Sequence, residues 1–174
     1  YVSEIYKSAF NLDNWHRNNI VYETGYPRND LLVNFSEDDV LRIKQNLGIT
    51  EDKKVILYAP TWRDNQHKSG VGYTFKNPLD FDKLKADLGE DYVILYRSHY
   101  FVGNNSGLRD DNFVIDVSKY PDIAELYIAS DMLITDYSSV FFDYAILERP
   151  IIFYMYDLAI YRDELRGFYI SLDE

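Results

Sequence analysis

The sequence predicts an α/β protein built on a doubly wound parallel sheet. Apolar runs of strand type alternate with stretches of helical spacing along most of the chain, about twenty residues apart. Hydrophobic residues make up 47% and aromatic residues 17% of the 174 residues, so a buried core is expected rather than disorder. A chain of this length suits one such domain or part of a larger protein.

The amino-terminal part predicts helices. Residues 2–10 have the spacing of a short amphipathic helix. Ser36 begins a second helix with an acidic first turn, which should run to about residue 47. Between these helices, residues 20–22 form a brief run of strand type, and residues 25–30 are rich in turn formers.

Strands and helices alternate from residue 54 on. The expected strands are residues 54–59, 92–96, 113–115, 132–135 and 151–153. The expected helices are residues 81–88, 121–129, 140–147 and 156–165. Pro121 suits a first helical turn, and Pro150 stops the helix that precedes it. The polar residues 64–78 are expected to form a loop.

The composition excludes several classes of protein. A net charge of −11 repels phosphate backbones and anionic membranes, so no nucleic-acid partner is expected. Without cysteine the chain has no disulfide framework and no thiolate chemistry. No apolar run reaches the roughly 20 residues that span a bilayer, and no signal peptide is visible. Because residue 1 is Tyr, we expect a piece of a longer protein.

Four polar clusters each follow a predicted strand. They are residues 61–63, 97–99, 116–118 and 135–139. Because the carboxyl ends of parallel strands lie at one edge of a sheet, the four clusters should line one crevice, where open α/β sheets bind ligands. Thr61, Thr135 and Asp136 are expected to belong to this pocket.

Basic and titratable side chains in these clusters indicate phosphate chemistry. Arg63 and Arg97 supply fixed positive charge for phosphate oxygens. His99 has an ordinary pKa near neutrality and could protonate a leaving phosphate, although a histidine at a strand end is more often structural. Trp62 is either a stacking surface or a core residue.

The turn at residues 135–139 predicts an anion cradle. It joins a strand to a helix start, whose free N–H groups favour phosphate, and Ser138 and Ser139 add hydroxyl donors. In the alternative interpretation, Asp136 or Ser138 merely caps the helix. Asp143, inside the same helix, could bind ribose hydroxyls or lie on an exposed face.

Metal and nucleophile motifs are missing from the sequence. It has no HExxH and no P-loop, and its paired serines lack the glycine-flanked elbow of a catalytic serine. We therefore expect no metal ligands and no cofactor, with a loosely held Mg²⁺ left open.

Four motifs together resemble one known family. They are Gly25-Tyr-Pro-Arg-Asn-Asp30, Leu57-Tyr-Ala-Pro-Thr-Trp-Arg63, Tyr96-Arg-Ser-His99 and Thr135-Asp-Tyr-Ser-Ser-Val-Phe-Phe-Asp143. In this order, they are similar to the CDP-glycerol glycerophosphotransferase family of teichoic-acid polymerases. The resemblance implies a GT-B enzyme of two Rossmann-like halves. Such an enzyme transfers glycerol phosphate (ribitol phosphate in relatives) from a CDP-activated donor to a growing wall polymer and releases CMP.

The resemblance implies that this chain is the carboxy-terminal, donor-nucleotide half. Residues 51–174 would form the donor domain, and residues 1–50 an inter-domain segment whose helices pack on the sheet. The amino-terminal half would supply a second histidine, the polymer acceptor site and the membrane surface. The chain alone should therefore not catalyse the transfer. The full-length protein would then be cytoplasmic, at the inner face of the cell membrane.

The resemblance also implies roles for individual residues. Arg97 and His99 would meet the donor phosphates, with His99 catalytic, and Ser138 and Ser139 would hold the diphosphate. The nucleoside would be bound by Asp116, Ser118 and Asp143. An acceptor hydroxyl would attack the β-phosphorus in line, with positive charge and helix N–H groups stabilising the negative oxygens.

Two other functions fit the same residues. A GT-B glycosyltransferase could use the cradle for a nucleotide sugar in capsule or wall synthesis. A Rossmann-like domain could instead bind a nucleotide for regulation, and loss of His99 would then leave function intact. A hydrolase lacks a visible nucleophile.

Overall fold

The computed structural model describes residues 2–63, 67–68, 72–73, 77–98 and 111–168. The chain divides into two compact units, Tyr1–Asp30 and Leu31–Glu174. The helices α2 (Leu31–Asn34) and α3 (Glu37–Asn46) belong to the second unit, with the sheet.

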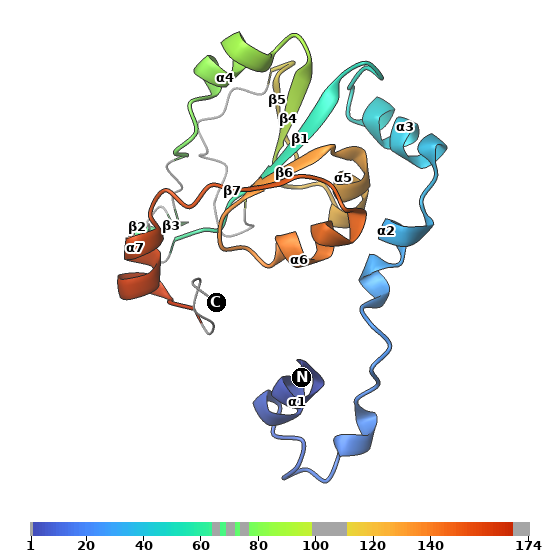
Figure 1. The fold of residues 1–174 in the computed structure, drawn as a ribbon, viewed down its shortest axis with the longest axis vertical. Coiled ribbons are helices and arrows are strands. Elements are labelled where there is room, and N and C mark those ends of the chain that lie inside the picture. Colours follow the sequence, from blue (N-terminus) through green and yellow to red (C-terminus); the bar gives the residue numbers. More distant parts are fainter. Residues whose placement is uncertain (1, 64–66, 69–71, 74–76, 99–110, 169–174) are drawn as a thin grey trace. The chain divides into compact units, whose positions relative to one another are not determined.

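The second unit is built on a five-stranded parallel sheet in the order β5-β4-β1-β6-β7 (Figure 1). Its strands are β1 (Lys54–Ala59), β4 (Tyr92–Tyr96), β5 (Val114–Asp116), β6 (Met132–Thr135) and β7 (Ile151–Phe153). From β1 the chain adds β4 and β5 on one side, then crosses back to add β6 and β7 on the other. The order therefore reverses between β1 and β6, and such a reversal opens a crevice at the carboxyl ends of the strands.

Helices cover both faces of this sheet. Val55 and Leu57 of β1 pack in one core cluster with residues of α3 and of α5 (Ile123–Ala129). Ile56 and Tyr58 point to the opposite face, because side chains alternate along a strand, and pack with α4 (Phe81–Leu88). Figure 1 shows α4 on one side of the sheet and α3 and α5 on the other. The predicted doubly wound class is confirmed.

The capping residues explain where several helices begin. Ser36 accepts a hydrogen bond from the backbone of Asp39, whose carboxylate accepts one from the backbone of Ser36, so both free N–H groups are satisfied. Asp80 and Asp122 cap α4 and α5, each accepting one backbone N–H through a carboxylate oxygen. The predicted starts of α3 and α4 agree with the structure, whereas α5 begins at Ile123, two residues after the predicted start at Pro121.

The structure corrects several predicted elements. Residues 20–22 form no strand; a 3-10 helix at Asn18–Ile20 stands there, and residues 2–30 offer no partner strand for pairing. The loop predicted at 64–78 contains a two-stranded antiparallel pair, β2 (His67–Lys68) and β3 (Gly72–Tyr73). The last predicted helix is a short α7 (Leu158–Ile160) followed by a π-helical turn at Tyr161–Leu165.

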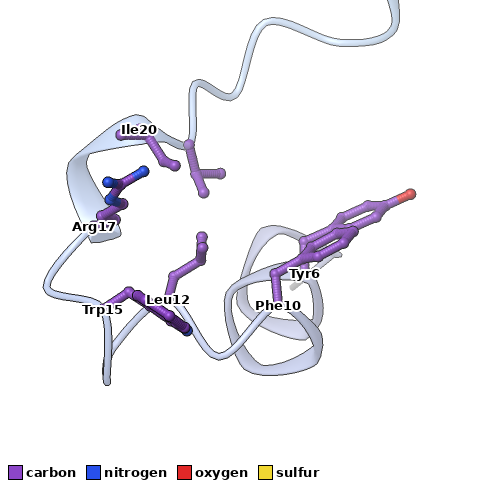
Figure 2. A pocket seen from close by; sticks show the side chains of 7 residues that line it. Tyr6, Phe10, Leu12, Trp15, Arg17 and Ile20 are labelled. Atoms are coloured by element: carbon purple, nitrogen blue, oxygen red, sulfur yellow. The ribbon is translucent and has the colours of Figure 1, made fainter.

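The first unit contains α1 (Val2–Ala9), close to its predicted bounds. Its apolar side chains surround an open hollow of about 610 Å³, shown in Figure 2. Tyr6, Phe10, Leu12 and Trp15 line it. Across the part of the chain that the structure describes, every helix is too short or too polar to cross a membrane.

Candidate functional site

A crevice of about 500 Å³ lies where β1, β4 and β6 end. It receives side chains from all four polar clusters: Thr61 and Trp62, Arg97 and Ser98, Ser118, and Tyr137 to Ser139. The predicted convergence of these clusters at one sheet edge is therefore confirmed. Tyr161 and Arg166, from the segment after β7, complete the wall.

The charge of this wall is opposite to that of the whole chain. The chain has 29 acidic and 18 basic residues, yet the charged lining residues that the structure describes are Arg97 and Arg166, with no carboxylate among them. Positive groups without competing carboxylates favour an anionic ligand. Serine and threonine hydroxyls on the same wall add neutral hydrogen-bond donors.

Arg97 is held rigidly at the end of β4. Its Nη1 donates to the carbonyl oxygens of Val117 at 3.1 Å and Tyr120 at 2.8 Å. Burial lowers the pKa of Arg97 from its ordinary value, but a guanidinium stays charged at any physiological pH. The two carbonyls fix the direction of the side chain, which borders the crevice.

Ser98 and Ser118 connect the ends of β4 and β5. The Ser98 hydroxyl donates to the Ser118 hydroxyl at 2.8 Å, and the Ser98 amide donates to the same oxygen at 2.9 Å. Asp116 accepts from the Ser118 amide at 2.9 Å and is itself exposed, outside the lining. Asp116 therefore shapes the turn that presents Ser118, and the nucleoside role of both residues stays a prediction.

Ser138 and Ser139 stand where α6 (Val140–Tyr144) begins. The Ser138 hydroxyl accepts from the Val140 amide at 3.5 Å, a long bond, and the Ser139 side chain makes no capping bond. Both serines line the crevice. Helix capping therefore uses little of the hydrogen-bonding capacity of Ser138 and Ser139. Asp143, half-buried on α6, is not among the described lining residues.

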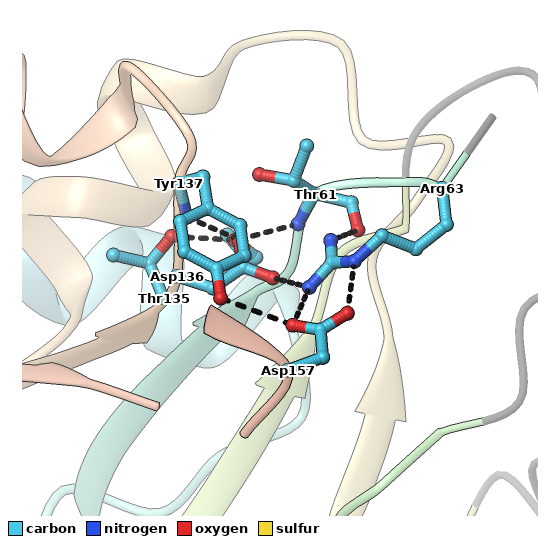
Figure 3. Close-up of polar contacts among 7 residues, drawn as sticks. Thr61, Arg63, Thr135, Asp136, Tyr137 and Asp157 are labelled. Carbon is cyan, nitrogen blue, oxygen red and sulfur yellow. Dashed lines mark hydrogen bonds and ion pairs between the residues drawn. The ribbon is translucent and has the colours of Figure 1, made fainter. Parts of the chain in front are cut away.

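Arg63 does not reach the crevice wall. Its guanidinium is buried, with 2% of the residue exposed, and pairs with two carboxylates (Figure 3). Nη2 lies 2.8 Å from Asp136, and Nε lies 2.8 Å from Asp157. Nη1 donates to the Thr61 carbonyl at 2.5 Å. This geometry gives Arg63 a structural role beside the crevice, and its contact with donor phosphate stays a prediction.

Asp136 ties the ends of β1 and β6 together. One carboxylate oxygen accepts from the amides of Thr61 at 2.8 Å and Tyr137 at 2.6 Å, while the other faces Arg63. Thr135 is buried and donates its hydroxyl to the Ala59 carbonyl at 2.8 Å. Asp136 and Thr135 are not among the described lining residues, and their hydrogen bonds hold the Tyr137-Ser138-Ser139 turn in place. Thr61 does line the crevice.

Asp157 is a site residue that sequence reasoning missed. It accepts from the Tyr137 hydroxyl at 3.0 Å as well as from Arg63, and Tyr137 stacks on Tyr161 with ring centroids 3.8 Å apart. A signal was present in the sequence, because residues 154–157 follow the end of β7 as the other four clusters follow their strands. Applying the strand-end rule to a fifth strand would have found it.

Asp157→Asn should make the free energy of unfolding depend less on pH in the acidic range. Burial raises the pKa of the Asp157 carboxyl, but Arg63 and Tyr137 lower it more, so the net pKa lies below its ordinary value. The stabilisation is then present above the unfolded pKa of about 3.9 and is lost as the pH falls through the folded pKa. Urea unfolding at pH 7, 4 and 3 should show the parent losing its advantage over Asp157→Asn. An equal advantage at all three pH values contradicts the assignment.

His99 follows Ser98 directly and lies outside the described residues, so its catalytic role stays a prediction. Trp62 lines the crevice, and the Arg166 guanidinium carbon lies 4.6 Å from the centre of its rings. Among the described residues, no group of three or more acidic or histidine side chains could hold a metal ion.

A family model described as CDP-Glycerol:Poly(glycerophosphate) glycerophosphotransferase matches residues 1–174. The chain belongs to this family. The teichoic acid poly(glycerol phosphate) polymerase of Staphylococcus epidermidis is 49% identical over 177 residues, covering 100% of this chain and 24% of the relative. The teichoic acid glycerol-phosphate transferase of Staphylococcus aureus is 50% identical over 173 residues, covering 98% and 43%. The chain thus spans less than half the length of either relative.

Two solved structures support the same family assignment. The wall teichoic acid polymerase TagF superposes with a TM-score of 0.82 at 47% identity, covering 99% of this chain and 41% of that one. A TagF variant soaked with CDPG gives 0.83 at 48% identity, again covering 99% and 41%. The expected Rossmann-like fold of the chain is confirmed.

Proposed function

We propose that the full-length protein transfers glycerol phosphate from CDP-glycerol to a hydroxyl of a growing teichoic-acid-like polymer and releases CMP. The family match and the names of the relatives support the reaction class. The observation that carries the proposal is the crevice itself. It lies at the reversal point of the sheet, is lined by arginines and hydroxyls, and has no carboxylate among its described lining residues.

The proposed chemistry is an in-line displacement at the β-phosphorus. The acceptor oxygen forms a bond to that phosphorus, the bond to the bridging oxygen breaks, and CMP leaves with the bridging oxygen. Arg97, Ser138 and Ser139 hold the negative oxygens, and His99 gives a proton to the departing phosphate. The acceptor loses its proton to a base from the amino-terminal half.

The acceptor and the location of the enzyme belong to the same proposal. The polymer binds to the amino-terminal half, which also provides the contact with the membrane. The full-length protein then works in the cytoplasm at the inner face of the membrane, where a CDP-activated donor is available.

A donor assay on the full-length protein tests this function. With a polymer acceptor, CMP release from CDP-glycerol should exceed nucleotide release from CDP-ribitol or from UDP- and GDP-sugars. Consumption of a nucleotide sugar in preference to CDP-glycerol contradicts the proposal and points to a glycosyltransferase. Absence of any transfer, together with nucleotide binding, favours a regulatory domain.

A further inference from the structure

Arg166 is an exposed arginine on the crevice wall, and no pattern in the sequence singles it out. Its guanidinium lies over the indole of Trp62, with 4.6 Å from the central carbon to the centre of the rings. Such a cation–π contact attracts the guanidinium to the face of the indole. The contact therefore keeps positive charge at the crevice even before a ligand arrives.

The backbone after α7 fixes where Arg166 stands. The amides of Arg166 and Gly167 both donate to the Tyr161 carbonyl at 3.1 Å, and Gly167 has a φ of +68°. Glycine adopts this left-handed conformation without steric cost, so the chain can turn sharply at this point. The ring of Tyr161 stacks on Tyr137, the residue directly before Ser138. Arg166 is thus anchored through a stack that borders the expected diphosphate turn.

The other two arginines of the site are less exposed than Arg166. Arg63 is buried between two carboxylates, and Arg97 donates to two backbone carbonyls. Arg166 differs from them because its side chain is exposed on the wall of the crevice. Its planar fork of N–H groups suits two phosphate oxygens at once.

We propose that Arg166 is a phosphate-binding residue of the donor site, and that Trp62 positions its guanidinium. The ligand class is a diphosphate, free or within a nucleotide. That the diphosphate belongs to a cytidine donor rests on the proposed function; that Arg166 binds a diphosphate does not.

Calorimetric titration of the full-length protein with inorganic pyrophosphate, CDP and cytidine tests the inference. Arg166→Gln should weaken pyrophosphate and CDP binding about 10- to 100-fold and leave any cytidine binding unchanged, because cytidine has no phosphate. Arg166→Lys should bind with intermediate affinity, since it keeps the charge and loses the fork. Trp62→Leu should weaken pyrophosphate binding less than Arg166→Gln does.

Arg162→Gln is the matched control. Arg162 lies on the π-helical turn that ends directly before Arg166. It is exposed, pairs with Asp163 at 2.7 Å, and is not among the described lining residues. Arg162→Gln makes the same change of charge as Arg166→Gln and should bind pyrophosphate like the parent. Equal pyrophosphate binding by the parent and Arg166→Gln overturns the inference, and so does a parent that binds no pyrophosphate. Pyrophosphate binding lost in Arg166→Gln, without preference for CDP, supports Arg166 and counts against the cytidine donor.

Discussion

His99→Ala in the full-length protein should lower the rate of glycerol phosphate transfer by about 100- to 10,000-fold, the range for loss of a general acid or base. The sequence places His99 directly after Ser98, whose side chain borders the crevice. An imidazole can give a proton to the departing phosphate of CMP near neutral pH. Initial rates of CMP release at saturating CDP-glycerol measure the effect.

Binding separates a catalytic role for His99 from a structural one. If His99 acts mainly on the leaving group, CDP should bind to His99→Ala within about threefold of the parent while transfer is lost. His16→Ala is the matched control, since His16 is an exposed histidine of the first unit. Transfer by His99→Ala at a rate close to that of the parent contradicts the catalytic assignment.

Arg63→Ala should lower the free energy of unfolding by about 3–5 kcal/mol, because removing one partner of a buried ion pair leaves an uncompensated charge. Arg63 and Asp136 are each 2% exposed, so the carboxylate that is left lies in a buried environment. The same change releases Asp157 and the carbonyl of Thr61. Urea unfolding followed by tryptophan fluorescence should show the loss as a lower midpoint.

A second variant shows whether the buried charge is the cause. Arg63→Met with Asp136→Asn removes both charges, keeps the volume and should recover part of the loss seen with Arg63→Met alone. Lys85→Ala is the control, because the Lys85–Asp111 pair is exposed and should contribute at most about 1 kcal/mol. If Arg63→Ala lowers the free energy of unfolding no more than Lys85→Ala does, the ion pairs of Arg63 do not stabilise the fold as expected.

Much of the fold could be predicted because its signals are local. Strands β1, β4, β6 and β7 match their predicted bounds, and α4 does too. The apolar runs lie within the elements that they define, and the caps and the stopping proline lie directly beside them. The strand predicted at residues 20–22 failed for the opposite reason: a strand needs a partner, and a short β-type run cannot show that it has none.

The site was predictable as a place but less so as a set of contacts. The strand-end rule brought Thr61, Arg97, Ser118 and Ser138 to one crevice, as the structure has them. The same rule could not tell that Arg63 turns inward, because its partner Asp157 lies 94 positions further along the chain. Long-range pairing of this kind leaves no periodic signal in the sequence.

The measurement that tests the account most directly is calorimetric titration of CDP, UDP and GDP into the full-length protein, with Ser138→Ala beside it. A crevice that holds a cytidine donor by its diphosphate predicts that CDP binds more tightly than UDP or GDP, and that Ser138→Ala weakens CDP binding. Preference for UDP or GDP, or CDP binding that Ser138→Ala leaves unchanged, would contradict the account.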